Sequence, residues 1–298
     1  MLFLAVAGVV NGSTSLVVCG LLFYTAGLLL RRAVKTDYLV QLTLAAGLAG
    51  ASMVVIGLWT ADRETSGAIM ASFVVSLLTL AVYPDVVMRF IATLGACVTL
   101  VLGCHELELG PDGAVALIAV AAGLAWHFEP RLLEHELTRP AQRPLAWGLV
   151  VSLLAFQLST VLENFDRAFR VGPAASVSVA VALLVLVVAV AREHGAALTS
   201  EPVLVALVAG VLLGAVMLHA PGVLAALYVA GLAFHRRSPL MLGLAILFLV
   251  VFMSSFYFRM ELTLLVRSLV LLGSGALLLG LREYVRRRFG PIVVEELP

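Results

Sequence analysis

Apolar residues in this chain come in runs of about 20, separated by short polar intervals. A helix of about 20 residues is long enough to cross the roughly 30 Å apolar core of a bilayer. The pattern predicts an all-α fold, a polytopic transmembrane helical bundle of about eleven spans, with ten or twelve as alternatives. The predicted spans are 10–30, 37–60, 66–83, 87–104, 113–128, 145–163, 174–191, 202–219, 221–235, 239–257 and 261–282.

Composition agrees with a bilayer as the solvent of this chain. Hydrophobic residues make up 62% of the sequence, charged residues make up 12%, and the mean hydropathy is +1.10. The polar intervals are too short to hold a soluble domain, so we predict a single transmembrane domain over 1–282. A short basic tail, 283–298, follows it, and the four arginines within 282–288 predict contact with phospholipid headgroups. The net charge of +1 argues against a nucleic-acid surface.

The lysines and arginines predict the orientation of the bundle. One set of alternate loops holds fourteen of them and the opposite set holds four. Cytoplasmic loops of membrane proteins collect lysine and arginine, so we predict the N-terminus outside and the C-terminus in the cytoplasm. The longest inner loop, 129–144, is predicted to form one or two turns of interfacial helix before its prolines end that helix.

One arginine, Arg267, lies inside the last predicted span, where a charge is costly. Thr263 and Ser274 fall on the same helix face as Arg267. Two placements of the guanidinium stay open on the sequence. It faces the interior of the bundle, or it extends along the helix to the outer interface near Glu261.

An inward-facing Arg267 would need a carboxylate or carbonyl partner, and Glu163 and Asp166, at and just after the end of an earlier span, are the candidates. That span also ends in polar residues that share one helix face. They are Gln157, Thr160, Asn164 and Arg167. Two polar faces at one depth predict a buried cluster whose commonest role is structural, with conduction or ligand binding as the alternative.

Small residues recur at every fourth position of another span, at Ala206, Gly210 and Gly214. Such a strip lets two helices approach closely, so we interpret it as a packing surface. The three cysteines lie in or beside apolar segments and are interpreted as buried small side chains rather than as disulfide or metal ligands. They are Cys19, Cys97 and Cys104.

Motifs for a reaction are not found in this sequence. His127, His135 and His219 have no second histidine or cysteine at a metal-binding spacing, so no metal site is predicted. We find no glycine-rich phosphate loop, no nucleophile elbow and no pair of carboxylates on one span. The sequence therefore predicts no enzyme class and no cofactor.

Several short motifs in the C-terminal part carry a family resemblance. They are Ala220 to Gly222, Ala225 to Leu227, Phe256 to Phe258, Thr263 to Leu265 before Arg267 and Ser268, and Gly273 to Gly275. Together with the earlier loop 83-YPDVVMRF-90, they resemble the bacterial integral-membrane family called domain of unknown function 4401. This chain has Glu261 where the family more often has aspartate, and Arg267 where lysine is frequent, so both charges are kept.

The resemblance implies a multi-pass protein of the bacterial inner membrane whose activity is unassigned, and it supplies no catalytic residues. Its typical gene neighbourhood implies a GDYXXLXY-motif protein, together with a further membrane protein of unknown function, as partners.

Two functions follow as hypotheses. The first is a non-enzymatic membrane component that holds partner proteins through its outer loops and lateral helix faces. The second is a transporter or channel for a small solute or ion, with an outward-open polar cavity around Arg267. An intramembrane enzyme acting on lipid is a more distant third hypothesis, because the sequence offers no site for it.

Overall fold

A computed structural model describes residues 12–33, 36–61, 65–134, 136, 138–161, 171–218 and 220–259, with 272, 279, 280, 283 and 287 beyond them. Within these residues the chain forms helices and no strands. The chain divides into two compact units, Met1–Phe252 and Met253–Pro298. The contacts that follow all lie within the first unit.

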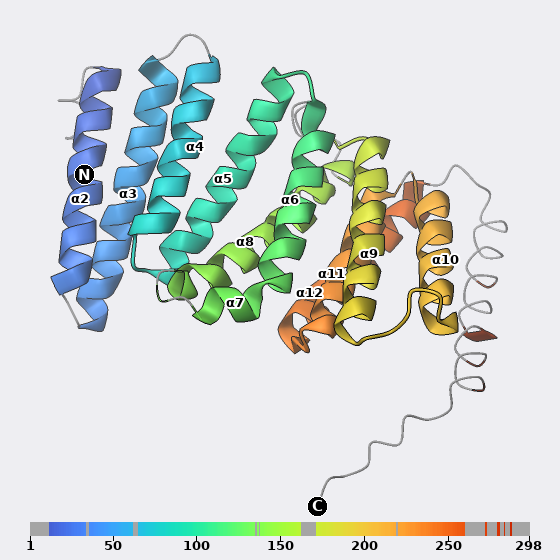
Figure 1. The fold of residues 1–298 in the computed structure, drawn as a ribbon. Helices are drawn as coiled ribbons and strands as arrows, with labels where there is room; N and C mark the ends of the chain where they lie inside the picture. The colour runs from blue at the N-terminus through green and yellow to red at the C-terminus, as the bar shows by residue number, and fades with distance from the viewer. Residues whose placement is uncertain are drawn as a thin grey trace, which may run out of the picture. The chain divides into compact units, whose positions relative to one another are not determined.

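The described helices appear in chain order in Figure 1. They are α2 (Ser13–Ala33), α3 (Asp37–Ala61), α4 (Thr65–Val82), α5 (Val86–Glu106), α6 (Gly110–His127), α7 (Glu129–Glu134), α8 (Arg139–Gln157) with the 3-10 turn η1 (Leu158–Thr160), α9 (Pro173–Glu193), α10 (Glu201–Val216), α11 (Pro221–His235) and α12 (Pro239–Arg259). Ten of the predicted spans each overlap one of these helices, and nearly all of the eleventh, 261–282, lies outside the described residues. The all-α class is therefore confirmed.

Four of the described helices, α2, α3, α5 and α9, are long and apolar enough to cross a membrane. Four shorter apolar stretches are Ser66–Val82, Glu201–Val216, Pro221–His235 and Pro239–Ser255. Helix α11, with 15 residues, is about 22 Å long and thus shorter than the apolar core of a typical bilayer. The total of eleven spans and the orientation of the chain stay predictions.

The inner loop forms the short helix predicted for it, since α7 (Glu129–Glu134) is six residues long. The start of α8 differs from the prediction, because the prolines that were expected to end a helix lie within α8. Helix α8 begins at Arg139, with Pro140 in its first turn and Pro144 inside it. Proline fits the first turn because the N–H groups there have no partner within the helix. Pro144 lies little more than one turn further in, where it forfeits a single backbone hydrogen bond. The added turn also packs on α6, since buried Gln142 donates Nε2–H to the carbonyl of Ala125 at 3.2 Å.

Helices α2 and α3 pack through glycines. A Cβ on Gly20 would lie 2.7 Å from the backbone nitrogen of Val54, and a Cβ on Gly50 would lie 2.7 Å from the carbonyl oxygen of Gly20. A Cβ on Gly27 would lie 2.9 Å from the nitrogen of Gly47. Each distance is shorter than a side-chain atom tolerates, so the two backbones approach closely only because these residues are glycine.

The loop before α5 ties α3 to the neighbouring helices through Tyr83. This side chain is fully buried, and its hydroxyl donates to the carbonyl of Thr43 on α3 at 2.9 Å. Its ring lies 5.8 Å from the ring of Tyr24 on α2, measured between centroids. The Tyr24 hydroxyl in turn donates to Thr79 Oγ1 on α4 at 3.1 Å. Two tyrosines thus connect α2, α3 and α4.

Asp85 in the same loop has two roles. Its Oδ1 accepts the backbone N–H of Val87 at 2.9 Å and that of Met88 at 3.3 Å, and so caps the N-terminus of α5. Its Oδ2 lies 3.4 Å from Arg31 Nε near the end of α2. The motif 83-YPDVVMRF-90, noted in the sequence, therefore holds the ends of α2 and α5 together.

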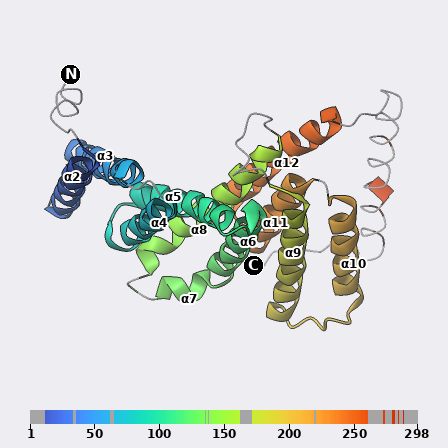
Figure 2. The same cartoon turned by 90° about the horizontal axis from the view of Figure 1, so that it is seen from above.

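Helices α6, α8 and α10 pack around α9 and α11. Helix α9 contacts α6, α10 and α11, and α11 also contacts α8. Figure 2 shows α6, α9 and α11 grouped together when the chain is seen from above. Tyr228 of α11 is buried, and its hydroxyl donates to the carbonyl of Ala119 on α6 at 2.8 Å. This bond joins α11 directly to α6.

The glycine packing of α2 and α3 predicts the effect of a single methyl group. Gly50→Ala is expected to lower the free energy of unfolding by about 1 to 3 kcal/mol, because the new Cβ meets backbone atoms that cannot move aside. Gly243→Ala in α12 is the matched control, since a Cβ there meets nothing within 4 Å. That control is expected to be neutral or stabilising by up to about 1 kcal/mol. Unfolding in lipid bicelles with increasing dodecyl sulfate measures the free energy of unfolding of both variants. Equal values for Gly50→Ala and Gly243→Ala would contradict this packing.

Tyr83→Phe removes one hydroxyl and leaves the carbonyl of Thr43 without its second hydrogen bond. A loss of about 1 to 2 kcal/mol is expected in the same unfolding assay. Tyr38→Phe, at an exposed tyrosine on α3, serves as the control and is expected to change stability by less than about 0.5 kcal/mol. A Tyr83→Phe variant as stable as this control would mean that the bond contributes nothing.

Candidate functional site

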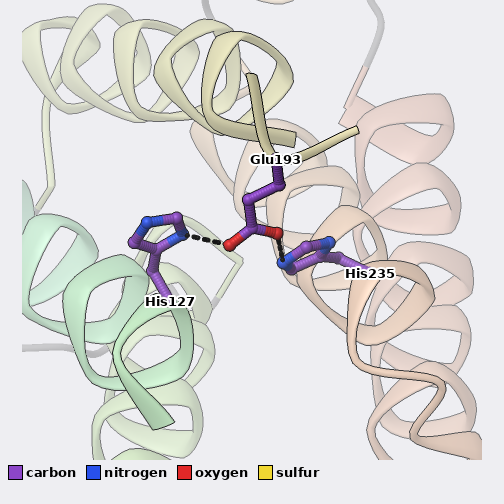
Figure 3. Close-up of side chains that lie close together, drawn as sticks. All are labelled: His127, Glu193 and His235. Atoms are coloured by element: carbon purple, nitrogen blue, oxygen red, sulfur yellow. Dashed lines mark ion pairs between the residues drawn. The ribbon is translucent and has the colours of Figure 1, made fainter. Parts of the chain in front are cut away.

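Three side chains that bear metal-ligating atoms meet at the ends of three helices. His127 is the last residue of α6, Glu193 is the last of α9, and His235 is the last of α11. Figure 3 shows the Glu193 carboxylate between the two imidazoles. We call these three residues the His–Glu–His cluster. The C-terminal ends of α6, α9 and α11 therefore converge on one point.

The distances within the cluster are short. His127 Nδ1 lies 3.4 Å from Glu193 Oε1, and His235 Nε2 lies 3.0 Å from Glu193 Oε2. One ligating atom from each of the three residues lies within 4.8 Å of the other two. The side chain of His235 is 8% exposed, whereas those of His127 and Glu193 are 32% and 39% exposed. The cluster is thus buried at His235 on α11 and partly exposed at His127 and Glu193.

The Nε2 atom of His235 is buried and makes no hydrogen bond to any residue that the structure describes. Its distance of 3.0 Å to Glu193 Oε2 is short enough for one, but the angles at the two atoms are not those of a hydrogen bond. A buried ring nitrogen without a hydrogen bond is uncommon in folded proteins. This nitrogen points at the carboxylate of the cluster without bonding to it.

Arg236, directly after the cluster, connects α11 to the end of α6. Its Nη2 donates to the carbonyl of His127 at 2.6 Å, and its Nε lies 4.0 Å from Glu129 Oε2. His194, next to Glu193, is exposed and places Nδ1 at 2.9 Å from the carbonyl of Val190 in its own helix. The carboxylates of Glu193 and Glu129 and the guanidinium of Arg236 thus lie close to the imidazoles.

The donor atoms of the cluster suit one class of ion. Two imidazole nitrogens and a carboxylate oxygen are ligands of zinc and of other divalent transition metals, whereas magnesium and calcium take oxygen ligands. The position of the cluster adds to this preference. The C-terminus of an α-helix carries a partial negative charge, and three such ends meet here.

Sequence spacing did not reveal the cluster, because its members lie on helices far apart in the chain. A search for neighbouring histidines and cysteines detects only sites built from one or two segments. One signal was nevertheless present. His127, Glu193 and His235 follow or end the fifth, seventh and ninth predicted spans, and alternate spans of a bundle end on the same side of a membrane.

The structure describes only two members of the polar cluster predicted around Arg267. Gln157 is fully buried at the end of α8, and Thr160 is the last residue of η1. The other predicted members lie outside the described residues. They are Arg267, Thr263, Ser274, Glu163, Asn164 and Asp166. Their proximity to one another stays a prediction.

The small residues of α10 face α9. Gly210 and Gly214 are buried, and a Cβ on them would lie 2.8 Å from Leu184 Cδ2 and 3.0 Å from Ala180 Cβ, respectively. Ala206 is half-buried. Helix α10 therefore turns its glycines toward α9 and its bulkier side chains away from it.

Comparison with known proteins gives one relationship. Residues 1–288 match the model of a family described as Domain of unknown function (DUF4401). No curated protein and no solved structure matches the chain. The match spans nearly the whole sequence and includes the loop 83–90 and all three residues of the His–Glu–His cluster. The chain belongs to the DUF4401 family.

Proposed function

We propose that the protein is a non-enzymatic, multi-pass component of the bacterial inner membrane that assembles with other membrane proteins. The observation that carries this proposal is the use of polar side chains in the described part of the chain. Tyr83, Tyr228 and Arg236 each donate to a backbone carbonyl of a neighbouring helix. Polar groups used in this way fix helices in register, as a structural component requires.

The cavity between α4, α5, α6, α7 and α8 supports the same proposal. Its volume is about 620 Å³, and its wall is almost entirely aliphatic and aromatic. The side chains that line it include Phe73, Leu77, Leu100, Leu117 and Leu149, with Thr93 as a hydroxyl-bearing exception. A polar solute or an ion needs polar groups to replace its hydration shell, so this cavity suits acyl chains or apolar side chains of a partner.

Helix α10 offers a lateral surface for such assembly. Its glycines pack on α9, while Val208, Leu212 and Val216 are exposed and recur at every fourth position. In a bilayer this stripe meets either acyl chains or a helix of another protein. We propose a helix of another membrane protein, and the family resemblance names the GDYXXLXY-motif protein as the first candidate.

Leu212→Trp separates these two neighbours of α10. A tryptophan side chain is tolerated where α10 faces acyl chains but does not fit a packed helix interface. The variant is therefore expected to reduce the yield of the complex with the partner protein at least about tenfold. Met70→Trp, at an exposed apolar position on α4, is the control and should leave the yield unchanged. Both variants are co-expressed with the GDYXXLXY-motif protein and analysed by native mass spectrometry after mild extraction. A wild-type chain that never co-purifies with this partner would contradict the proposal.

The assembly proposal and the transport hypothesis differ in what they predict for the isolated chain. On the assembly proposal, wild-type protein reconstituted alone in liposomes gives ion and small-solute leakage equal to that of empty liposomes. Stopped-flow measurements with fluorescent indicators for protons, potassium and chloride test this expectation. A flux that depends on the protein and is lost in Arg267→Ala would favour a transporter or channel and overturn the assembly proposal.

A further inference from the structure

We propose that the His–Glu–His cluster binds a divalent transition metal of the zinc class through His127 Nδ1, a carboxylate oxygen of Glu193 and His235 Nε2. The ion would fasten the C-terminal ends of α6, α9 and α11 to one another. This site is independent of the assembly surface on α10.

The geometry of the cluster is close to that of ligands around one ion. Two ligands at about 2.0 to 2.1 Å from a tetrahedral zinc ion lie about 3.3 to 3.4 Å apart. The two nitrogen–oxygen distances in the cluster, 3.4 Å from His127 Nδ1 and 3.0 Å from His235 Nε2, are to different oxygens of Glu193, and one ligating atom from each of the three residues lies within 4.8 Å of the other two. Glu193 and His127 are partly exposed, so their side chains can make the small adjustments that a bound ion requires.

The buried nitrogen of His235 is the second observation that points to a ligand. It is shielded from solvent, has no hydrogen bond, and lies beside the carboxylate. A buried polar nitrogen without a hydrogen bond costs free energy. A metal ion between Nε2 and the carboxylate would satisfy both.

Helix dipoles and the Glu193 carboxylate favour a cation at this position, and the guanidinium of Arg236 opposes it. The ion would lie at the negative ends of three helix dipoles and next to Glu193. The opposing charge is that of Arg236, which is held at Glu129 and at the carbonyl of His127. The other titratable group nearby is the exposed His194, whose ring contacts its own helix.

Three protein ligands leave one position of a tetrahedral ion for water or for a fourth ligand. Zinc is therefore expected to bind with a stoichiometry of one per chain and to raise the unfolding temperature, because it joins three helices only in the folded state. Magnesium is expected to do neither, since it prefers oxygen ligands.

The test uses the full-length protein purified in nanodiscs through a tag without histidine. Zinc and cobalt are titrated in competition with a chromophoric chelator, with magnesium as the negative control. His127→Gln, Glu193→Gln and His235→Gln are each expected to weaken zinc binding more than about 100-fold, the upper range for loss of a supporting residue. His105→Gln, at an exposed histidine in the last turn of α5, is the matched control and should bind zinc as the wild type does.

Circular dichroism and size-exclusion chromatography identify any variant that does not fold. Glu193→Gln preserves the shape of its side chain and keeps the proposal testable if a histidine variant is lost. X-ray absorption of the zinc-loaded wild type gives an independent result, for which two imidazoles and two oxygen ligands are expected. Wild-type protein that binds zinc no better than magnesium would overturn the proposal, as would zinc binding that all three variants retain. In either case the cluster would be a contact between side chains only.

Discussion

Hydrogen bonds from side chains to backbone carbonyls of neighbouring helices are the interaction on which the described structure depends. A helix satisfies its own backbone groups, so apolar helices in a bilayer have little reason to choose one neighbour over another. Tyr83 to Thr43, Tyr228 to Ala119 and Arg236 to His127 supply that choice. Each donor lies at a helix end or in a helix that packs closely, and glycines at Gly20, Gly27 and Gly50 allow the approach between α2 and α3. Small residues allow two helices to approach closely, and the hydrogen bonds from polar side chains determine which helices pack together.

The helices could be predicted from the sequence because the bilayer imposes a length on every apolar run. Their neighbours could not, since an apolar run such as those of α2, α9 and α10 does not specify which other helix it packs against. The predicted start of α8 was wrong for a local reason. Pro140 falls in the first turn, where N–H groups have no partner within the helix, Pro144 forfeits one backbone hydrogen bond, and the contact of Gln142 with α6 holds the extra turn. The polar residues that organise the fold looked ordinary in the sequence.

The His–Glu–His cluster illustrates the same limit. Glu193 and the two histidines are typical residues for helix ends at a membrane interface, and nothing in their spacing relates them. Their meeting depends on α6, α9 and α11 ending together, which is what alternate spans do. On the predicted orientation that meeting point is cytoplasmic. The apolar cavity and the apolar face on α10 support the proposed role as a component that assembles with other membrane proteins, and the match to the DUF4401 family covers the residues that form them.

The convergence of three helix ends is the central claim, and cross-linking within one chain tests it most directly. Cysteines replace His127 and His235 in a chain whose Cys19, Cys97 and Cys104 are changed to alanine. A short bifunctional thiol reagent is then applied in native membranes, and mass spectrometry of the digested chain identifies the linked peptides. A second variant carries cysteines in place of His105 and His235. The account predicts efficient linkage of positions 127 and 235 in the first variant and no linkage of positions 105 and 235 in the second. Equal linkage of the two pairs, or none of the first, would contradict it.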